Sequence, residues 1–261
     1  MTFNKKKPLR LITIPVSHYC EKARWALTRL QISYTEEGHM PPFHLLATSR
    51  VGGKLTPVLI TESGAFTDST NILQYLDEVA PNNAKLYPTD PDLRSQVEKL
   101  EDLFDEQLGP AIRRWGYFCV MDDDKLMQRN WCHGVPFVER ALFPVVFPFM
   151  RKVVRQRLNI TPESAARAYE QISIIFEKVG DLLADGRIYL VGDSFSAADI
   201  TFAALAAPAL APPEHPIKGG VGLQELPPKA VSEINAFRET PAGVFGLRLY
   251  SNQRWQGCHA Q

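Results

Sequence analysis

The stretch Pro15-Val16-Ser17-His18-Tyr19-Cys20-Glu21-Lys22-Ala23-Arg24 decides the fold, because a strand pattern ends there and a helix pattern begins. Residues 9–14 are rich in branched apolar side chains, which predicts a strand. Apolar residues then recur at helical spacing, which predicts a helix over 19–30 with one buried stripe. On this interpretation Glu21 and Lys22 lie on the face that points to water.

Ser17 lies at the predicted start of that helix, where unpaired backbone N–H groups and the helix dipole favour an anion. The spacing Ser17-x-x-Cys20 has the form of a redox C-x-x-C motif with its first cysteine replaced by serine, which removes disulfide chemistry. A serine hydroxyl at this point can donate a hydrogen bond to a thiolate of a ligand and lower the pKa of that thiol. The alternative is that Ser17 only caps the helix.

Composition excludes several classes of protein. A chain of 261 residues predicts two domains, and the equal numbers of basic and acidic residues, 29 each, argue against a nucleic-acid partner. The most apolar later window, 134–150, is too short and too interrupted for a transmembrane segment, so we expect none. The four cysteines lack metal-ligand spacing and are too few for a disulfide framework, which predicts no metal site and a reducing, cytoplasmic location.

The rest of the first third of the chain alternates strand and helix patterns. We expect a second strand over 31–36, a short helix near 44–47, a strand over 57–61, a short returning strand at 65–66 and a helix from 69 to 79. This order indicates a sheet that is covered by helices and contains βαβ connections.

Three motifs of this region, in order and spacing, resemble the glutathione transferase superfamily. They are Ser17-His18-Tyr19-Cys20-Glu21-Lys22-Ala23-Arg24, Leu55-Thr56-Pro57-Val58-Leu59 and Phe66-Thr67-Asp68-Ser69-Thr70-Asn71-Ile72-Leu73-Gln74-Tyr75-Leu76. The resemblance implies a thioredoxin-like α/β domain over 1–86 and an all-α helical bundle domain over 92–261. It also implies that Pro57 is cis and that Ser17 is the catalytic residue of a serine-type enzyme.

The resemblance also assigns residues that bind glutathione. Thr56, before Pro57, would present its backbone N–H and C=O to the cysteinyl part. Asp68 would pair with the α-amino group, and Ser69, at a helix N-terminus, would bind the γ-glutamyl carboxylate. His44 is the candidate for the glycine carboxylate by spacing, with His39 as its rival.

The second domain begins after a linker, 80–91, and its first helix pattern runs over 91–121 with a kink or break expected at Gly109-Pro110. We expect a further helix over 161–185, a long loop over 208–228 and one or two closing helices over 231–250. Aromatic residues of the first helix either line a pocket for the second substrate or, as is more common at helical spacing, belong to the core; these are Trp115, Tyr117 and Phe118.

An inserted segment near 122–159 departs from the family pattern. Its aromatic run, followed by Arg151, Lys152, Arg155 and Arg157, is compatible with a helix that lies at a membrane interface. A lid or an extra helix packed over the substrate crevice is the interpretation we prefer, because the prolines would interrupt any long amphipathic face.

Near its end the chain contains Tyr189-Leu190-Val191-Gly192-Asp193-Ser194-Phe195-Ser196-Ala197-Ala198-Asp199-Ile200, which resembles a second superfamily signature. Ser196 is predicted to cap a helix whose third residue, Asp199, reaches back to the cap. The role of Asp199 on this interpretation is in folding.

The sequence therefore predicts a transferase that uses Ser17 to hold glutathione, its co-substrate, as a thiolate for attack on a small apolar electrophile, as in detoxification. The resemblance implies a homodimer. Two alternatives stay open: a thiol transferase or peroxidase that uses Cys20, and a protein that binds glutathione or another ligand without catalysis.

Overall fold

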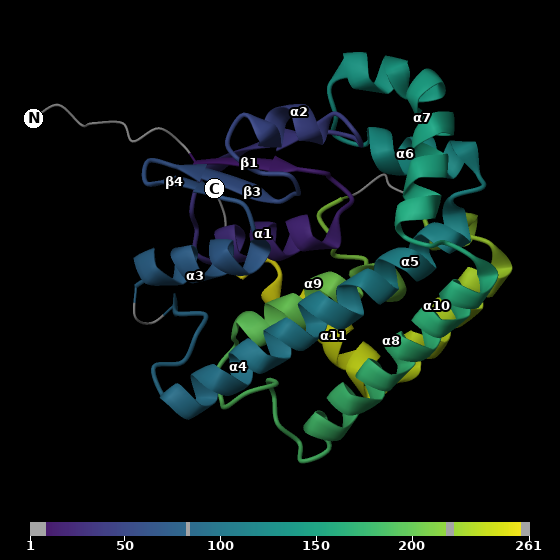
Figure 1. Cartoon of the computed structure of the whole chain (residues 1–261). Helices are drawn as coiled ribbons and strands as arrows, with labels where there is room; N and C mark the ends of the chain where they lie inside the picture. Colours follow the sequence, from purple (N-terminus) through teal and green to yellow (C-terminus); the bar gives the residue numbers. More distant parts are fainter. Residues whose placement is uncertain (1–8, 82–83, 218–221, 257–261) are drawn as a thin grey trace, which may run out of the picture.

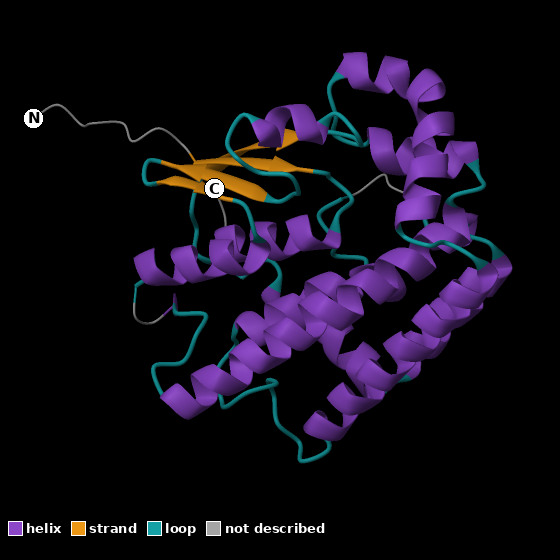
Figure 2. Ribbon diagram, viewed as in Figure 1, coloured by secondary structure: helices purple, strands orange, loops and turns teal. Residues whose placement is uncertain are grey.

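The computed structural model describes residues 9–81, 84–217 and 222–256, and it begins with a four-stranded sheet (Figure 1 and Figure 2). The strand order is β2-β1-β3-β4, with β1 parallel to β2 and the other pairs antiparallel. The strands are β1 (Leu9–Thr13), β2 (Tyr34–Gly38), β3 (Val58–Thr61) and β4 (Gly64–Phe66).

The second strand begins at Tyr34, so its predicted start at residue 31 was wrong. Gln31 has a positive φ of 55°, and the amide of Ile32 donates to the carbonyl of Leu27. These residues therefore form the C-terminal turn of the preceding helix and are not available to the sheet.

Helices cover both faces of the sheet: α2 (His44–Ser49) lies on one face, and α1 (His18–Arg29) and α3 (Ser69–Val79) lie on the other (Figure 1). This thioredoxin-like arrangement confirms the predicted α/β fold of the N-terminal part. The prediction that Glu21 and Lys22 face water was wrong, because both side chains are fully buried. Helix α1 packs on α3 and also against the helical region, so it has no solvent face at these positions.

The rest of the chain is helical, as predicted, and is built around α9 (Ala197–Leu210), in which every residue except Pro208 is buried. Helix α9 contacts α1 as well as helices of the second region. Those helices are α4 (Pro91–Leu103), α5 (Gly109–Val120), α8 (Pro162–Leu183), α10 (Pro228–Glu239) and α11 (Pro241–Gln253).

The irregularity expected at Gly109-Pro110 takes another form. A π-helical segment, η2 (Phe104–Leu108), joins α4 to α5 without a break. The wider turn shifts the hydrogen-bond register just before Pro110, so the chain continues as a helix. Glycine fits at position 109, because a Cβ atom there would clash with the hydroxyl group of Tyr19.

The prediction that the long loop begins at Pro208 was wrong, because Pro208 lies in the last turn of α9. The helix ends at Leu210, and the left-handed Ala211 (φ 43°) follows it. A proline in the last turn removes one hydrogen bond, and packing of the surrounding helices holds the turn in place.

The inserted segment folds into two helices, α6 (Asp124–Cys132) and α7 (Phe137–Arg157). The expectation that prolines interrupt this segment was wrong, since Pro144 and Pro148 both lie inside α7. Both prolines are exposed, so water can bind the carbonyl groups that they leave without a partner.

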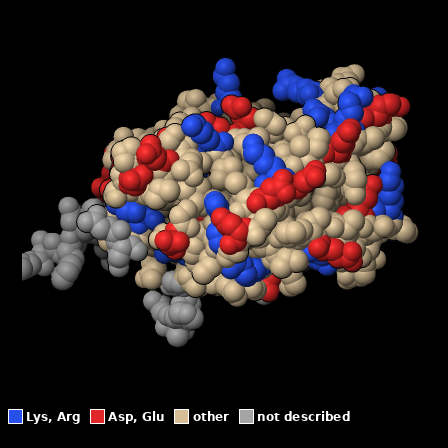
Figure 3. All heavy atoms as spheres, turned by 90° about the horizontal axis from the view of Figure 1, so that it is seen from below, with Lys and Arg blue, Asp and Glu red and all other residues tan. Residues whose placement is uncertain are grey.

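The surface carries charges of both signs. Figure 3 shows acidic and basic side chains interspersed over the face seen from below. Among the described residues, no helix is both long enough and apolar enough to span a membrane. The same residues include no group of three or more His, Cys, Asp or Glu side chains that could hold a metal ion.

Candidate functional site

A cavity of about 840 Å³ lies where the sheet region meets the helical region. Its size is within the range typical of small-molecule sites. The first region lines it with all of the residues singled out for glutathione: Ser17, His44, Thr56, Pro57, Asp68 and Ser69. The folding of the chain therefore brings together in one cavity residues that the sequence separates by up to 52 positions, from 17 to 69.

Ser17 lies between β1 and α1 at the N-cap position, with an extended backbone (φ −73°, ψ 125°). Its amide donates to the carbonyl of Ile14 over 2.9 Å, which fixes the turn. The Ser17 hydroxyl makes no capping hydrogen bond to α1, whose residues are all described, so the role of a simple cap does not account for it. Ser17 lines the cavity at the start of the helix, where the first N–H groups have no partner in the helix, and this is a suitable place for an anion.

Cys20 lies one helical turn after Ser17 and is fully buried. Burial raises the pKa of its thiol, although hydrogen bonds with Ser17 and Thr56 act in the opposite direction. A buried thiol with a raised pKa is a poor nucleophile. The environment of Cys20 is therefore that of a packing residue beneath the cavity.

The peptide bond between Thr56 and Pro57 is cis, which confirms the prediction. Pro57 is buried and Thr56 is half-buried immediately before β3 begins at Val58. A second cis bond, between Pro41 and Pro42, was not predicted. No pattern in the sequence distinguishes it from an ordinary loop.

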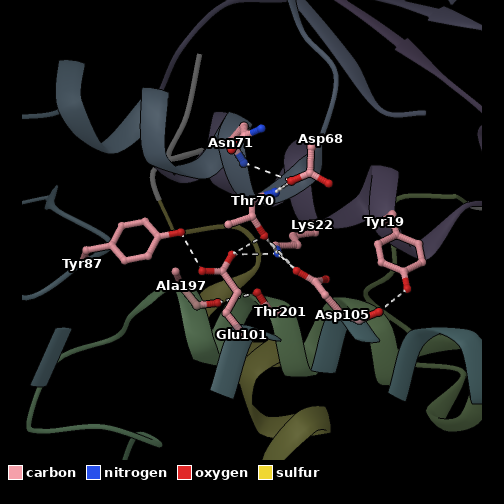
Figure 4. Close-up of polar contacts among 10 residues, drawn as sticks. All are labelled: Tyr19, Lys22, Asp68, Thr70, Asn71, Tyr87, Glu101, Asp105, Ala197 and Thr201. Carbon is pink, nitrogen blue, oxygen red and sulfur yellow. Dashed lines mark hydrogen bonds and ion pairs between the residues drawn. The ribbon is translucent and has the colours of Figure 1, made fainter. Parts of the chain in front are cut away.

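Asp68 is the N-cap of α3, and its Oδ1 accepts hydrogen bonds from the amides of Thr70 (2.9 Å) and Asn71 (3.2 Å), as Figure 4 shows. Both bonds use the same oxygen, and the residue is exposed, so Oδ2 is accessible to a ligand. Ser69 is buried in the first turn, where unpaired N–H groups favour a carboxylate. This pair offers one acceptor for an ammonium group and one site for an anion.

His44 and His39 lie in different surroundings. His44 begins α2 and lines the cavity, and its buried Nδ1 has no hydrogen-bond partner among the described residues. Burial, with a smaller effect of His39, lowers the pKa of His44 to about 4, so at neutral pH it is an uncharged donor. His39 instead lies 2.6 Å from Glu139, Nδ1 to Oε1, outside the cavity wall. The geometry therefore favours His44 over His39 as the candidate for binding the glycine carboxylate.

The helical region supplies the more apolar wall. Trp115 and Tyr117 line the cavity and are also packed, whereas Phe118 is not a lining residue. Trp115 is further held by a hydrogen bond from Nε1 to Glu233 Oε2 (2.7 Å). Two of the three aromatic residues therefore line the cavity and are packed as well, and their contact with a second substrate stays a prediction.

Sequence reasoning missed several lining residues. Arg113 is exposed at the cavity. The pKa of His18 is lowered to about 3, first by the burial of His18 and second by the positive charge of Arg113. Asn130 and Trp131 of α6 also line the cavity, whereas no residue of α7, all of which is described, does. The helical spacing of Ile112, Trp115 and Cys119 marks the wall, but no local signal identifies the contribution of α6.

Tyr19 does not compete with Ser17 for the ligand. Its hydroxyl donates to the backbone carbonyl of Asp105 over 2.7 Å, and burial raises its pKa. It therefore serves to join α1 to the helical region.

A network of buried ion pairs and hydrogen bonds lies beside the cavity (Figure 4). Lys22 Nζ lies 2.6 Å from Asp105 Oδ2, 2.8 Å from Glu101 Oε1 and 3.0 Å from the hydroxyl oxygen of Thr70. The hydroxyl of Tyr87 donates to the other oxygen of Glu101 over 2.7 Å. Helices α1, α3 and α4 and the π-helical segment are thereby fixed to one another beside the cavity.

Comparison with known protein families finds one matching domain. Residues 11–84 match the family model described as glutathione S-transferase, N-terminal domain. A curated tobacco protein (Nicotiana tabacum), named "Probable glutathione S-transferase parA", is 35% identical over 89 residues. That alignment covers 34% of this chain and 40% of the tobacco protein, so the chain aligns with less than half of that relative's length.

Solved structures resemble the fold over almost the whole chain. Beta-etherase LigF from Sphingobium sp. strain SYK-6 superposes with a TM-score of 0.59 at 18% identity, over 93% of this chain and 99% of that one. Ure2p in complex with S-hexylglutathione superposes with a TM-score of 0.55 at 15% identity, over 93% and 99%. At these identities the likeness concerns the fold, and the chemistry has to be argued from the cavity.

Proposed function

We propose that the chain, whose residues 11–84 match the glutathione S-transferase N-terminal domain, binds glutathione in this cavity and transfers its thiolate to a small apolar electrophile. The observation that carries the proposal is that Ser17 lines the cavity at the start of α1 and that its hydroxyl is not used as a helix cap. The two domains would divide near residue 86, and we propose a homodimer in the cytoplasm.

In this mechanism Ser17 donates a hydrogen bond to the glutathione sulfur, and the N-terminus of α1 adds a favourable dipole. The thiol proton passes to solvent, and the sulfur forms a bond to the electrophilic carbon as the bond from that carbon to a leaving group breaks and the leaving group departs with the electron pair. Thr56 would hold the cysteinyl backbone, Asp68 the α-amino group and Ser69 the γ-glutamyl carboxylate. His44, uncharged at neutral pH, would donate a hydrogen bond to the glycine carboxylate.

The cavity wall opposite these residues fits an apolar second substrate. Trp115, Tyr117 and Ile234 present apolar surface to it, and Arg113 adds one positive charge. Binding both substrates in one cavity would orient the sulfur for attack.

We expect Ser17→Ala to lower kcat/KM for conjugation by about 10²-fold, a typical effect of removing one hydrogen bond to a developing or bound anion. Glutathione affinity should change little, because the backbone and carboxylate contacts stay in place. The measurements are turnover with a panel of apolar electrophiles and a pH titration of bound glutathione by thiolate absorbance. The apparent pKa of the bound thiol should rise in the variant.

Cys20→Ala is the matched control, since it changes a buried neighbour of Ser17. The proposal predicts retained conjugation in Cys20→Ala and loss in Ser17→Ala. The opposite result would favour a thiol transferase or peroxidase. Glutathione binding without turnover on any electrophile would favour a non-catalytic binding protein.

A further inference from the structure

Helix α7 carries a continuous apolar stripe on its outer surface. Val138, Leu142, Val145 and Phe149 are 65%, 39%, 76% and 68% exposed. They occupy positions i, i+4, i+7 and i+11, so they lie on one face over about 17 Å of helix. Phe137, at the helix start, is 79% exposed. Contiguous exposed apolar surface of this kind marks an interaction site.

The stripe is not needed to hold α7 in the fold. The opposite face buries Phe143 and Phe147, which stack on each other with ring centroids 4.7 Å apart. Phe147 also packs edge-on against Trp131 of α6. In Figure 1 the helix stands at the edge of the molecule beside α6. The outer face is therefore available to a partner.

The charges around the stripe are basic. Glu139, the one acidic residue in α7, is buried and holds His39 and the amide of Met40 (2.9 Å). Arg151 and Arg155 pair with Asp124 and Asp122, respectively. The other basic residues of the helix are exposed and form no ion pair with any described residue; these are Arg140, Lys152 and Arg157.

We propose that α7 docks the protein on the surface of an anionic lipid membrane. An exposed apolar stripe flanked by lysine and arginine is the arrangement of helices that lie in the membrane interface. The apolar side chains would enter the boundary between headgroups and acyl chains. Lys152 and Arg157, which flank the stripe, would lie near lipid phosphates and carboxylates, which supply the negative charge that the helix lacks.

The same charges argue against a second copy of the chain as the occupant. If two α7 helices pack antiparallel about Val145, Lys152 of each copy meets Val138 of the other, so two lysines are set against apolar side chains. A parallel pair brings each basic residue next to its own equivalent. Neither helix offers an exposed acidic residue in compensation, so an antiparallel pair would bury lysines without a partner and a parallel pair would set like charges against each other.

The experiment is co-sedimentation of the full chain with vesicles of phosphatidylcholine, alone or mixed with phosphatidylserine. We expect binding to the mixed vesicles that salt weakens, and little binding to phosphatidylcholine alone. The variant Val145→Glu/Phe149→Glu should lose binding. Lys152→Gln/Arg157→Gln should weaken it by about 30-fold, which corresponds to roughly 1 kcal/mol for each removed charge.

The matched controls are Ile174→Glu, on the exposed face of α8, and Lys178→Gln on the same helix, which should bind as the parent does. Thermal melts establish that each variant is folded. The proposal is overturned if the parent binds neither kind of vesicle, if both kinds bind equally, or if the stripe variants bind unchanged. Conversion of a dimer to a monomer by Val145→Glu/Phe149→Glu, without vesicle binding by the parent, would assign the stripe to a protein interface.

Discussion

Replacement of Lys22 by methionine is expected to lower the free energy of unfolding by about 3–5 kcal/mol, the usual cost of removing one partner from a buried ion pair. The Lys22 side chain is fully buried, and Glu101 is 1% exposed. Without the ammonium group, Glu101 and Asp105 would face each other with no cation between them. The measurement is a guanidinium titration followed by circular dichroism.

The effect should depend on pH. Burial raises the pKa of Asp105, and Lys22 is the largest influence that opposes this rise. In Lys22→Met the Asp105 carboxyl group would take up a proton more readily, which relieves the repulsion. The destabilisation is therefore expected to be larger at pH 8 than at pH 5.

Two further variants distinguish charge from volume. Lys229→Met removes a lysine that is 80% exposed and 3.7 Å from Glu233, and it should cost less than about 0.5 kcal/mol. Lys22→Met/Asp105→Asn leaves a single buried carboxylate and should recover part of the lost stability. If the double variant is less stable than Lys22→Met, the ion-pair explanation is wrong.

The buried state of Lys22 shows where sequence reasoning stops. Local spacing places Glu21 and Lys22 on the polar side of α1, and this would be correct for a helix with one covered face. A second face of α1 is covered by α9, which follows about 170 residues later in the chain. No local sequence pattern predicts such a contact. Arg254, which pairs with Glu21 over 2.6 Å, is more distant still.

The residues proposed to bind glutathione were easier to predict than the burial of Lys22, because each of them depends on local backbone chemistry. Ser17 and Asp68 begin helices, and Thr56 precedes a proline at a strand start, so short motifs identify them. The wall formed by α6 and by the loop at Pro212 depends on tertiary packing and was not foreseen. Likewise, the prolines in α7 are tolerated only because that side of the helix faces solvent.

Replacement of Asp199 by alanine is expected to lower the free energy of unfolding by about 3–5 kcal/mol at pH 7. The buried carboxylate accepts hydrogen bonds from the amides of Leu190 (2.9 Å) and Ser196 (2.8 Å) and from the Ser196 hydroxyl (2.9 Å). Alanine would leave these three donors buried without an acceptor, at about 1–3 kcal/mol each. Asp193→Ala, at an exposed position of the same loop, should change stability by no more than about 0.5 kcal/mol.

The pH dependence gives a second measure of Asp199. Burial raises the pKa of its carboxyl group from 3.8 to about 6, despite the three hydrogen bonds. Between these values the folded protein holds a proton that the unfolded chain has released, so the stability contributed by Asp199 falls as the pH rises from 4 to 6. Asp199→Asn does not titrate, and the stability advantage of the parent over this variant should shrink by up to about 3 kcal/mol between pH 4 and pH 7. A constant difference across this range, or an unchanged melting temperature in Asp199→Ala, would show that the residue does not carry the role in folding assigned to it.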